Sequence, residues 1–155
     1  MAEGDPEASI YEHAGGEPGI RKIVEIFYAS IFHDPVLLPV FGHPVATHVD
    51  HLTAFLAEEF GGPRRYSDEL GGFAHIVSVH RHLKITEEQR QRFIDLFMAA
   101  VDKAGFANDG RFLRTVKSAI EFGTQVARVN SNAATDADLF PLNSIPLWRW
   151  HEAED

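Results

Sequence analysis

The chain has 155 residues, of which 45% are apolar and 24% are charged, so it is long enough and apolar enough to fold as one domain with its own core. Its 14 basic and 23 acidic residues give a net charge of -9, which argues against nucleic acid and anionic membrane surfaces as partners. Cysteine is absent, which excludes disulfides, thiolate catalysis and metal sites built on thiolates.

The chain begins with an acidic N-terminal extension, residues 1–9, that has neither the basic nor the apolar region of a secretion signal. No later segment approaches the ~18 consecutive apolar residues of a membrane-spanning helix. We therefore expect a cytoplasmic protein that does not insert into a membrane.

Beyond the extension, apolar residues recur at the three- and four-residue steps of amphipathic helices, and no segment alternates like a strand. The first long helix is predicted to start near Pro18 and to end at Asp34-Pro35, because proline interrupts helical hydrogen bonding. A second helix is predicted from about Val45 to Phe60, where Gly61-Gly62-Pro63 stops it.

The second half of the chain predicts two more long helices. Residues 64–83 are polar and glycine-bearing at first and apolar later, which indicates a loop that leads into a short helix. Thr86 and Gln89 form a capping-box pattern at the start of the third long helix. Asp109 is placed to cap the last helix, whose periodicity stops at Asn130.

Residues 10–129 therefore form one small all-helical domain with about four main helices. The segment that follows, residues 130–155, lacks periodicity but contains both tryptophans, Trp148 and Trp150. Because large aromatic rings contribute strongly to packing, we expect an irregular arm that packs on its own domain or on a partner's. The second option implies a homodimer.

Nine histidines are the unusual feature of the composition, and the predicted helices separate them. His80 shares an apolar helix face, whereas His75 and His82 lie on the wetter side. His48 lies at the edge of the second helix's apolar stripe, whereas His51 is rotated toward solvent. His80 and His48 are thus candidate pocket residues, although a histidine on an apolar face is more often a hydrogen-bonded core residue than a ligand.

Tyr28 borders the first apolar stripe, where its hydroxyl needs a hydrogen-bonding partner if it is buried. Other patterns for catalysis or ligand binding are absent: the chain has no phosphate-binding glycine loop, no His-Glu-x-x-His helix and no nucleophile elbow. The pairs Glu58-Glu59 and Arg64-Arg65 are interpreted as solvated surface charges.

Short motifs follow one another in a particular order: Ile10-Tyr11-Glu12, Gly15-Gly16-Glu17, Phe27-Tyr28, Asp34-Pro35, Val40-Phe41, Phe55-Leu56, Gly61-Gly62-Pro63, Tyr66 and His80-x-x-Leu83-x-Ile85-Thr86. Together, over about residues 10–128, they resemble a truncated hemoglobin, the short bacterial globin with a two-over-two helical arrangement around haem. The long segment between Pro63 and His80 is similar to the second group of that family.

The resemblance implies an all-α, globin-like fold, a truncated two-over-two helical sandwich, that holds haem b. His80 matches the proximal histidine, which is the metal ligand. Tyr28 matches the distal tyrosine, and Phe41 matches a phenylalanine that packs on the haem face. His48 then takes the distal gate position, with Leu52 one turn further in. The remaining implied cofactor-binding residues are Phe55, Leu56, Tyr66, Val79, Arg81, Leu83, Ile85 and Phe93.

Two positions depart from the pattern of the second group. Phe93 stands where its members usually carry a tryptophan, so the distal pocket is expected to be more apolar. Val79 stands where a basic residue often precedes the proximal histidine, so the haem propionates need other partners. The candidates are Arg81, His82, Lys84 and Arg64-Arg65.

The function that the resemblance implies is a haem protein for oxygen or another diatomic ligand, as in oxygen transport. Nitric oxide dioxygenase or peroxidase-type activity with an unidentified reductase would extend this function, and no catalytic residue is assigned.

Three alternatives to this function stay open. In the first, His48 also binds the iron and gives a six-coordinate redox or sensing protein. The second is a globin-like interaction module without haem. The third is a non-haem metal site on His48, His51 and His80.

Overall fold

The computed structural model describes residues 8–42 and 46–151. Residues 1–7 of the predicted extension, Val45 at the predicted start of the second helix and residues 152–155 of the arm lie outside the described residues. Within the described ranges the chain is helical and contains no strand. Its α-helices are α1 (Ile10–His13), α2 (Gly16–Ile31), α3 (Leu38–Phe41), α4 (Ala46–Glu59), α5 (Arg65–Glu69), α6 (Gly72–His80), α7 (Glu87–Val101) and α8 (Gly110–Asn132).

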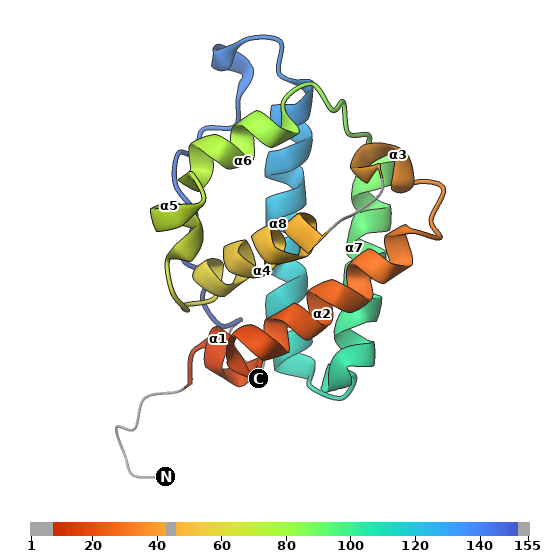
Figure 1. The fold of residues 1–155 in the computed structure, drawn as a ribbon, viewed down its shortest axis with the longest axis vertical. Coiled ribbons are helices and arrows are strands. Elements are labelled where there is room, and N and C mark those ends of the chain that lie inside the picture. Colours follow the sequence, from red (N-terminus) through yellow and green to blue (C-terminus); the bar gives the residue numbers. More distant parts are fainter. Residues whose placement is uncertain (1–7, 43–45, 152–155) are drawn as a thin grey trace.

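The four long helices are stacked in two pairs (Figure 1). α2 packs against α4, and α7 packs against α8, while α2 also contacts α7. The short helices α5 and α6 follow α4, and α6 returns the chain to α8. This arrangement confirms the predicted all-α, two-over-two globin fold.

The core forms where the apolar faces of α2, α7 and α8 meet. The stripe predicted on α2 is buried at Ile20, Ile23, Val24, Phe27 and Ile31. The ring centroids of Phe27 and Phe97 are 5.3 Å apart, which joins α2 to α7. Burial of each such side chain stabilises the fold by about 1.5 to 3 kcal/mol. A helix turned about its axis would expose these side chains to water, so their burial fixes how each helix is oriented.

Two predicted helix starts are confirmed. At α7, the Thr86 hydroxyl accepts a hydrogen bond from the backbone of Gln89, and the Gln89 side chain accepts one from the backbone of Thr86. At α8, the Asp109 carboxylate accepts a hydrogen bond from Phe112 N at 3.3 Å. Each cap satisfies backbone N–H groups that have no partner within the helix.

The predicted helices differ from the observed ones at the end of α8 and in the segment 64–83, and the short helix α3 was not predicted. α8 continues to Asn132, past the predicted end at Asn130. The segment 64–83 contains two helices rather than a loop and one helix, with Gly71 between them at φ 99°. Glycine adopts this left-handed conformation without steric cost, so the chain can stop one helix and start the next within two residues.

The C-terminal arm packs on its own domain. Trp148 N donates a hydrogen bond to the Glu59 carbonyl at 2.7 Å, and Trp150 Nε1 donates one to the Ala8 carbonyl at 2.9 Å. The Trp148 ring also lies 5.7 Å from the Phe122 ring of α8. The arm thereby connects the end of α4, the start of the described chain and α8.

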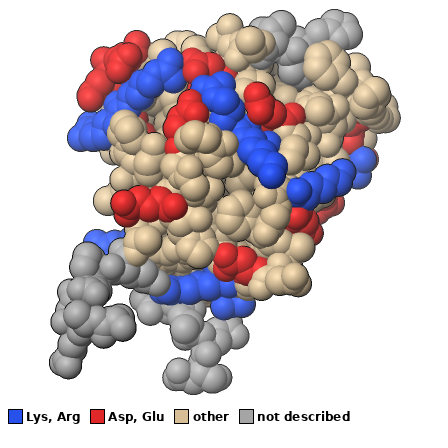
Figure 2. Space-filling model, turned by 60° about the horizontal axis from the view of Figure 1, so that its bottom comes forward, with Lys and Arg blue, Asp and Glu red and all other residues tan. Residues whose placement is uncertain are grey.

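The surface carries both signs of charge. In the face that Figure 2 shows, acidic and basic side chains are interspersed rather than gathered into one basic patch. None of the described helices combines the length and the apolar character needed to cross a membrane.

Asp34 fixes the turn between α2 and α3 from a buried position. Its Oδ1 accepts hydrogen bonds from Val36 N at 2.9 Å and Leu37 N at 3.2 Å, and its Oδ2 accepts one from Arg92 Nε of α7. Burial raises the pKa of Asp34, but the hydrogen bonds from Arg92 and the two amides outweigh it and leave the pKa below its ordinary value.

We expect Asp34→Ala to lower the free energy of unfolding by about 1 to 3 kcal/mol at pH 7, because it leaves these donors without their acceptor. Since the folded-state pKa is the lower one, the stabilisation is present above the unfolded pKa of 3.8 and is lost as the pH falls through the folded pKa. Urea denaturation at pH 7 and pH 3 measures both effects. Asp68→Ala, at an exposed position on α5, is the control, and an equal loss in both variants would contradict this role.

Candidate functional site

A cavity of about 570 Å³ lies inside the helical sandwich. It is walled mainly by α4, α6, α7 and α8, with two residues from α3 and single residues from α2 and α5. Among its lining residues are twelve of the predicted site residues: Tyr28, Phe41, His48, Leu52, Phe55, Leu56, Tyr66, Val79, His80, Leu83, Ile85 and Phe93. The fold thus brings together residues that are spread over half the sequence.

His80, the last residue of α6, presents one ring nitrogen to the cavity. Its Nδ1 donates a hydrogen bond to the Ile76 carbonyl at 2.8 Å, which fixes the proton on Nδ1 and leaves the lone pair of Nε2 free. Burial lowers the pKa of His80, with the Ile76 hydrogen bond acting in the opposite sense. The ring is therefore neutral at pH 7, which is the form that binds metals.

Tyr28 lies on the α2 side of the cavity and is 6% exposed. Its ring lies 5.6 Å from Phe41 and 5.9 Å from His48, centroid to centroid. Burial raises the pKa of the Tyr28 hydroxyl far above its ordinary value. The hydroxyl therefore keeps its proton at physiological pH and can donate a hydrogen bond into the cavity.

Phe93 on α7 forms an aromatic wall together with neighbouring rings. It stacks on Phe41 with centroids 6.2 Å apart and lies 4.6 Å from Phe27. A second stacked contact, to Phe97, continues the wall toward the core. This part of the cavity is therefore lined by aromatic rings without polar atoms.

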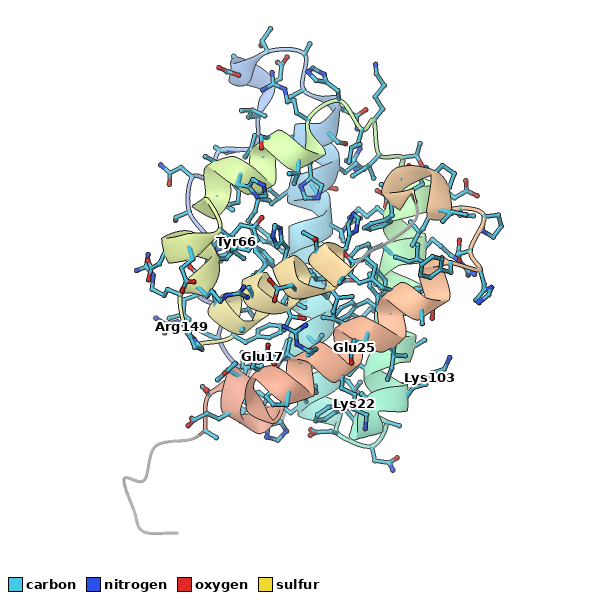
Figure 3. The ribbon with its side chains drawn as sticks, in the orientation of Figure 1. Glu17, Lys22, Glu25, Tyr66, Lys103 and Arg149 are labelled. Carbon is cyan, nitrogen blue, oxygen red and sulfur yellow. The ribbon has the colours of Figure 1, made fainter. Side chains whose placement is uncertain are left out.

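On another side of the cavity, three polar aromatic side chains lie close together: Tyr66, His51 and His75. Tyr66, 4% exposed, extends from α5 toward the interior (Figure 3), and its hydroxyl is 2.8 Å from His75 Nδ1. The His51 ring lies 6.0 Å from Tyr66 and 5.7 Å from His75. The prediction that His51 and His75 face solvent was wrong, because both are partly buried and line the cavity. α5, which the sequence did not predict, supplies the tyrosine that covers them.

The pair Glu58-Glu59 was also placed wrongly. Glu58 is 7% exposed and accepts hydrogen bonds from the backbone N and the hydroxyl of Ser67. Glu59 is 2% exposed and lines the cavity. A signal for Glu59 was present in the sequence, since it follows Leu52 by seven residues and Leu56 by three and so shares their helix face.

The predicted propionate partners lie outside the cavity wall. Arg81 donates hydrogen bonds to Asp136 at 3.0 Å and to the Ala133 carbonyl at 3.3 Å, so it holds the start of the arm. The other candidates, His82, Lys84 and Arg64-Arg65, are likewise absent from the lining. Arg90, which the sequence did not single out, lines the cavity and binds Glu87 at 2.9 Å.

The arm and α8 supply further walls that sequence reasoning missed. Leu142 and Pro146 of the arm line the cavity, together with Ile120 and Gly123 of α8. No periodic pattern marks the arm, so only its packing could reveal this contribution. Among the described residues, no group of three histidine or acidic side chains is placed to hold a metal ion, so His48, His51 and His80 do not form the non-haem site considered from the sequence.

Comparison with known proteins gives a family and a fold. The family model of bacterial-like globins matches residues 9–120. The group 1 truncated hemoglobin GlbN of Nostoc commune is 38% identical over 60 residues, which are 38% of this chain and 51% of that protein. The group 2 truncated hemoglobin YjbI of Bacillus subtilis is 29% identical over 98 residues, which are 62% of this chain and 72% of that protein. The chain thus spans about half the length of the GlbN protein that it matches.

Solved structures extend the likeness over most of the chain. The hemoglobin of the thermophilic phototroph Chloroflexus aurantiacus has a TM-score of 0.68 at 30% identity, covering 78% of this chain and 98% of that one. The group II truncated hemoglobin of Bacillus anthracis has a TM-score of 0.73 at 24% identity, covering 86% and 99%. The second likeness concerns the fold alone.

Proposed function

Because the chain belongs to the bacterial-like globin family, and to its truncated hemoglobins, we propose that it holds haem b on His80 and reversibly binds oxygen or another diatomic ligand there. One observation carries the proposal: a histidine whose Nδ1 is hydrogen-bonded to the Ile76 carbonyl, and whose lone pair is therefore on Nε2, lines an apolar cavity. Since cysteine is absent, the thioether links of c-type haem are excluded, which favours haem b.

The residues of the cavity fit the group. Haem is a large apolar disc with two carboxylates, and a cavity of about 570 Å³ is within the ordinary range for a bound cofactor. Phe41, Phe93 and Leu52 offer apolar contacts for the disc. His51 and Arg90 line the cavity and offer hydrogen-bond donors for the carboxylates. Arg81, His82 and Lys84, which are close to His80 in the sequence, do not line it.

The chain's own residues set how a ligand is held. When bound, haem supplies an iron atom that accepts a diatomic ligand. His80 holds the group through Nε2, and its hydrogen bond to the Ile76 carbonyl fixes the orientation of the ring. Tyr28 offers a hydroxyl donor on the opposite side, while Phe41 and Phe93 exclude water. These contacts favour retention of a ligand that carries partial negative charge.

The six-coordinate alternative rests on His48. It lies on α4 next to Tyr28 and Phe41 and lines the same cavity as His80. A second histidine at the iron would give an electron-transfer or sensing protein in place of an oxygen carrier.

Enzymatic turnover of nitric oxide or peroxide is a further possible activity of the haem-loaded protein, and it would require a one-electron reductase as a partner.

The proposal is tested by the visible spectra of the purified protein supplied with haemin. We expect a strong Soret band in the ferric form and shifts on reduction with dithionite and on addition of carbon monoxide. A five-coordinate ferrous spectrum supports the carrier, and a six-coordinate one supports the His48 alternative. If haemin yields no Soret band beyond that of free haemin, the interaction module remains and haem binding is rejected.

A further inference from the structure

Glu59 is a buried acid that the proposed function does not use. It is the last residue of α4, is 2% exposed and lines the cavity. Its carbonyl accepts the hydrogen bond from Trp148 N at 2.7 Å, which ties the end of α4 to the arm. Leu142 and Pro146 of the arm line the same cavity.

The two adjacent glutamates differ in their partners. The Glu58 carboxylate is satisfied by Ser67 and lies 3.9 Å from Arg64 Nε. Among the residues that the structure describes, none donates a hydrogen bond to the Glu59 carboxyl or forms an ion pair with it, and burial is the sole cause of its pKa shift. A carboxylate that is buried without such partners is strongly disfavoured, so the protonated form is preferred.

Burial raises the pKa of Glu59 from 4.5 to about 8. The acid is therefore predominantly neutral at pH 7, but it can lose its proton within an accessible pH range. A group that is neutral and buried, yet close to its pKa, responds to any change of charge in the same low-dielectric cavity.

We propose that Glu59 is the proton-exchanging residue of the haem pocket, taking up a proton when the iron is reduced and releasing it when the iron is oxidised. This inference rests on the proposed function. At pH values above about 8, where Glu59 is ionised, reduction would transfer one electron from an external one-electron donor to ferric haem, and one proton from solvent would convert the Glu59 carboxylate to the acid. The net charge of the cavity is then unchanged, which stabilises the ferrous state.

Other titratable groups line the cavity from neighbouring helices. Burial raises the pKa of Tyr28 on α2 and of Tyr66 on α5, so both stay uncharged around pH 8. Arg90 on α7 is paired with Glu87. Arg149, which follows Trp148 in the arm, is exposed and is absent from the lining (Figure 3).

The remaining titratable groups of the cavity are histidines. His48 and His51 share α4 with Glu59, and His75 and His80 come from α6. Each carries charge only when protonated, so a pH dependence alone would not identify its origin. Variants of Glu59 make the assignment, because they leave all four histidines in place.

The test is the midpoint potential of the haem-loaded protein between pH 6 and pH 10. In the wild type we expect the potential to be level where Glu59 is protonated in both iron states, and to fall at higher pH, above the pKa of Glu59 in the ferric protein. Glu59→Gln should remove this dependence, and Glu59→Asp, which keeps a carboxyl group, should retain one. Glu25→Gln, at an exposed position on α2, is the matched control and should follow the wild type.

A second readout needs no haem. In the apoprotein, the infrared band of a protonated carboxylic acid should be present at pH 7, disappear as the pH is raised to 10, and be absent in Glu59→Gln. Because the folded pKa is the higher one, the wild type should also lose stability as the pH rises from 4.5 to 8, whereas Glu59→Gln should not.

The outcomes separate the two proposals. A normal Soret band with the same pH dependence in Glu59→Gln as in the wild type overturns the role of Glu59 and leaves haem binding intact. An apoprotein without the infrared band at pH 7 overturns it as well. A chain that takes up no haem rejects the proposed function, and the coupling to iron with it.

Discussion

Replacement of His80 by alanine is expected to abolish stable haem binding. His80 is the residue that presents a neutral imidazole nitrogen with a fixed orientation to the cavity, through the 2.8 Å hydrogen bond from Nδ1 to the Ile76 carbonyl. Loss of a partner that only orients a metal ligand costs about 10- to 100-fold in affinity, so loss of the ligand itself should cost at least ~100-fold. Haemin titration followed at the Soret band measures the effect.

Two variants accompany this experiment. His33→Ala removes an exposed histidine and should bind haem as the wild type does. His80→Gly creates space for free imidazole, which should restore the Soret band when it is added to the buffer. If His80→Ala binds haemin with wild-type affinity and an unchanged spectrum, another residue holds the iron and the assignment of His80 is wrong.

The second large effect is expected on the opposite side of the cavity. In the variant Tyr28→Phe with His48→Leu, oxygen should dissociate about ten to a hundred times faster than in the wild type. Oxygen held at haem iron carries partial negative charge, and a hydrogen bond to a charged acceptor contributes about 1.5 to 3 kcal/mol. Each 1.4 kcal/mol corresponds to a tenfold change in rate or affinity.

Stopped-flow displacement of oxygen by carbon monoxide measures the dissociation rate. The single variants divide the effect, because Tyr28 and His48 lie 5.9 Å apart, close enough for one to compensate for the other. Tyr28→Phe is conservative, since it keeps the ring between Phe27 and Phe41. Unchanged dissociation in the double variant would show that neither side chain contacts the ligand.

The sequence predicted the parts of the fold that local physical chemistry controls. The stripe of α2 that contains Phe27, the capping box of Thr86 and Gln89, and the cap at Asp109 depend on residues within one or two helical turns. The order of short motifs then indicated the globin family, and the helical arrangement agrees with it.

Longer-range features escaped prediction for an equally physical reason. A charged residue on a helix looks solvated unless its tertiary surroundings are known, and Glu59 is buried at the end of α4, where Trp148 of the arm binds its backbone carbonyl. His75 looked exposed because its partner, Tyr66, lies on the unpredicted helix α5. Arg81 was assigned to the pocket from its position beside His80, although its side chain turns to Asp136.

The sequence by itself therefore determined the long helices, the caps at the starts of α7 and α8 and the family, because these follow from spacing and capping along the chain. Only the tertiary structure decided that the arm packs on its own domain and which polar groups face the cavity. Burial depends on what covers a side chain, and here the covering segments come from distant parts of the chain. Glu59 is buried in the wall of this cavity, and burial raises the pKa of its carboxyl group so that the acid holds a proton at pH 7.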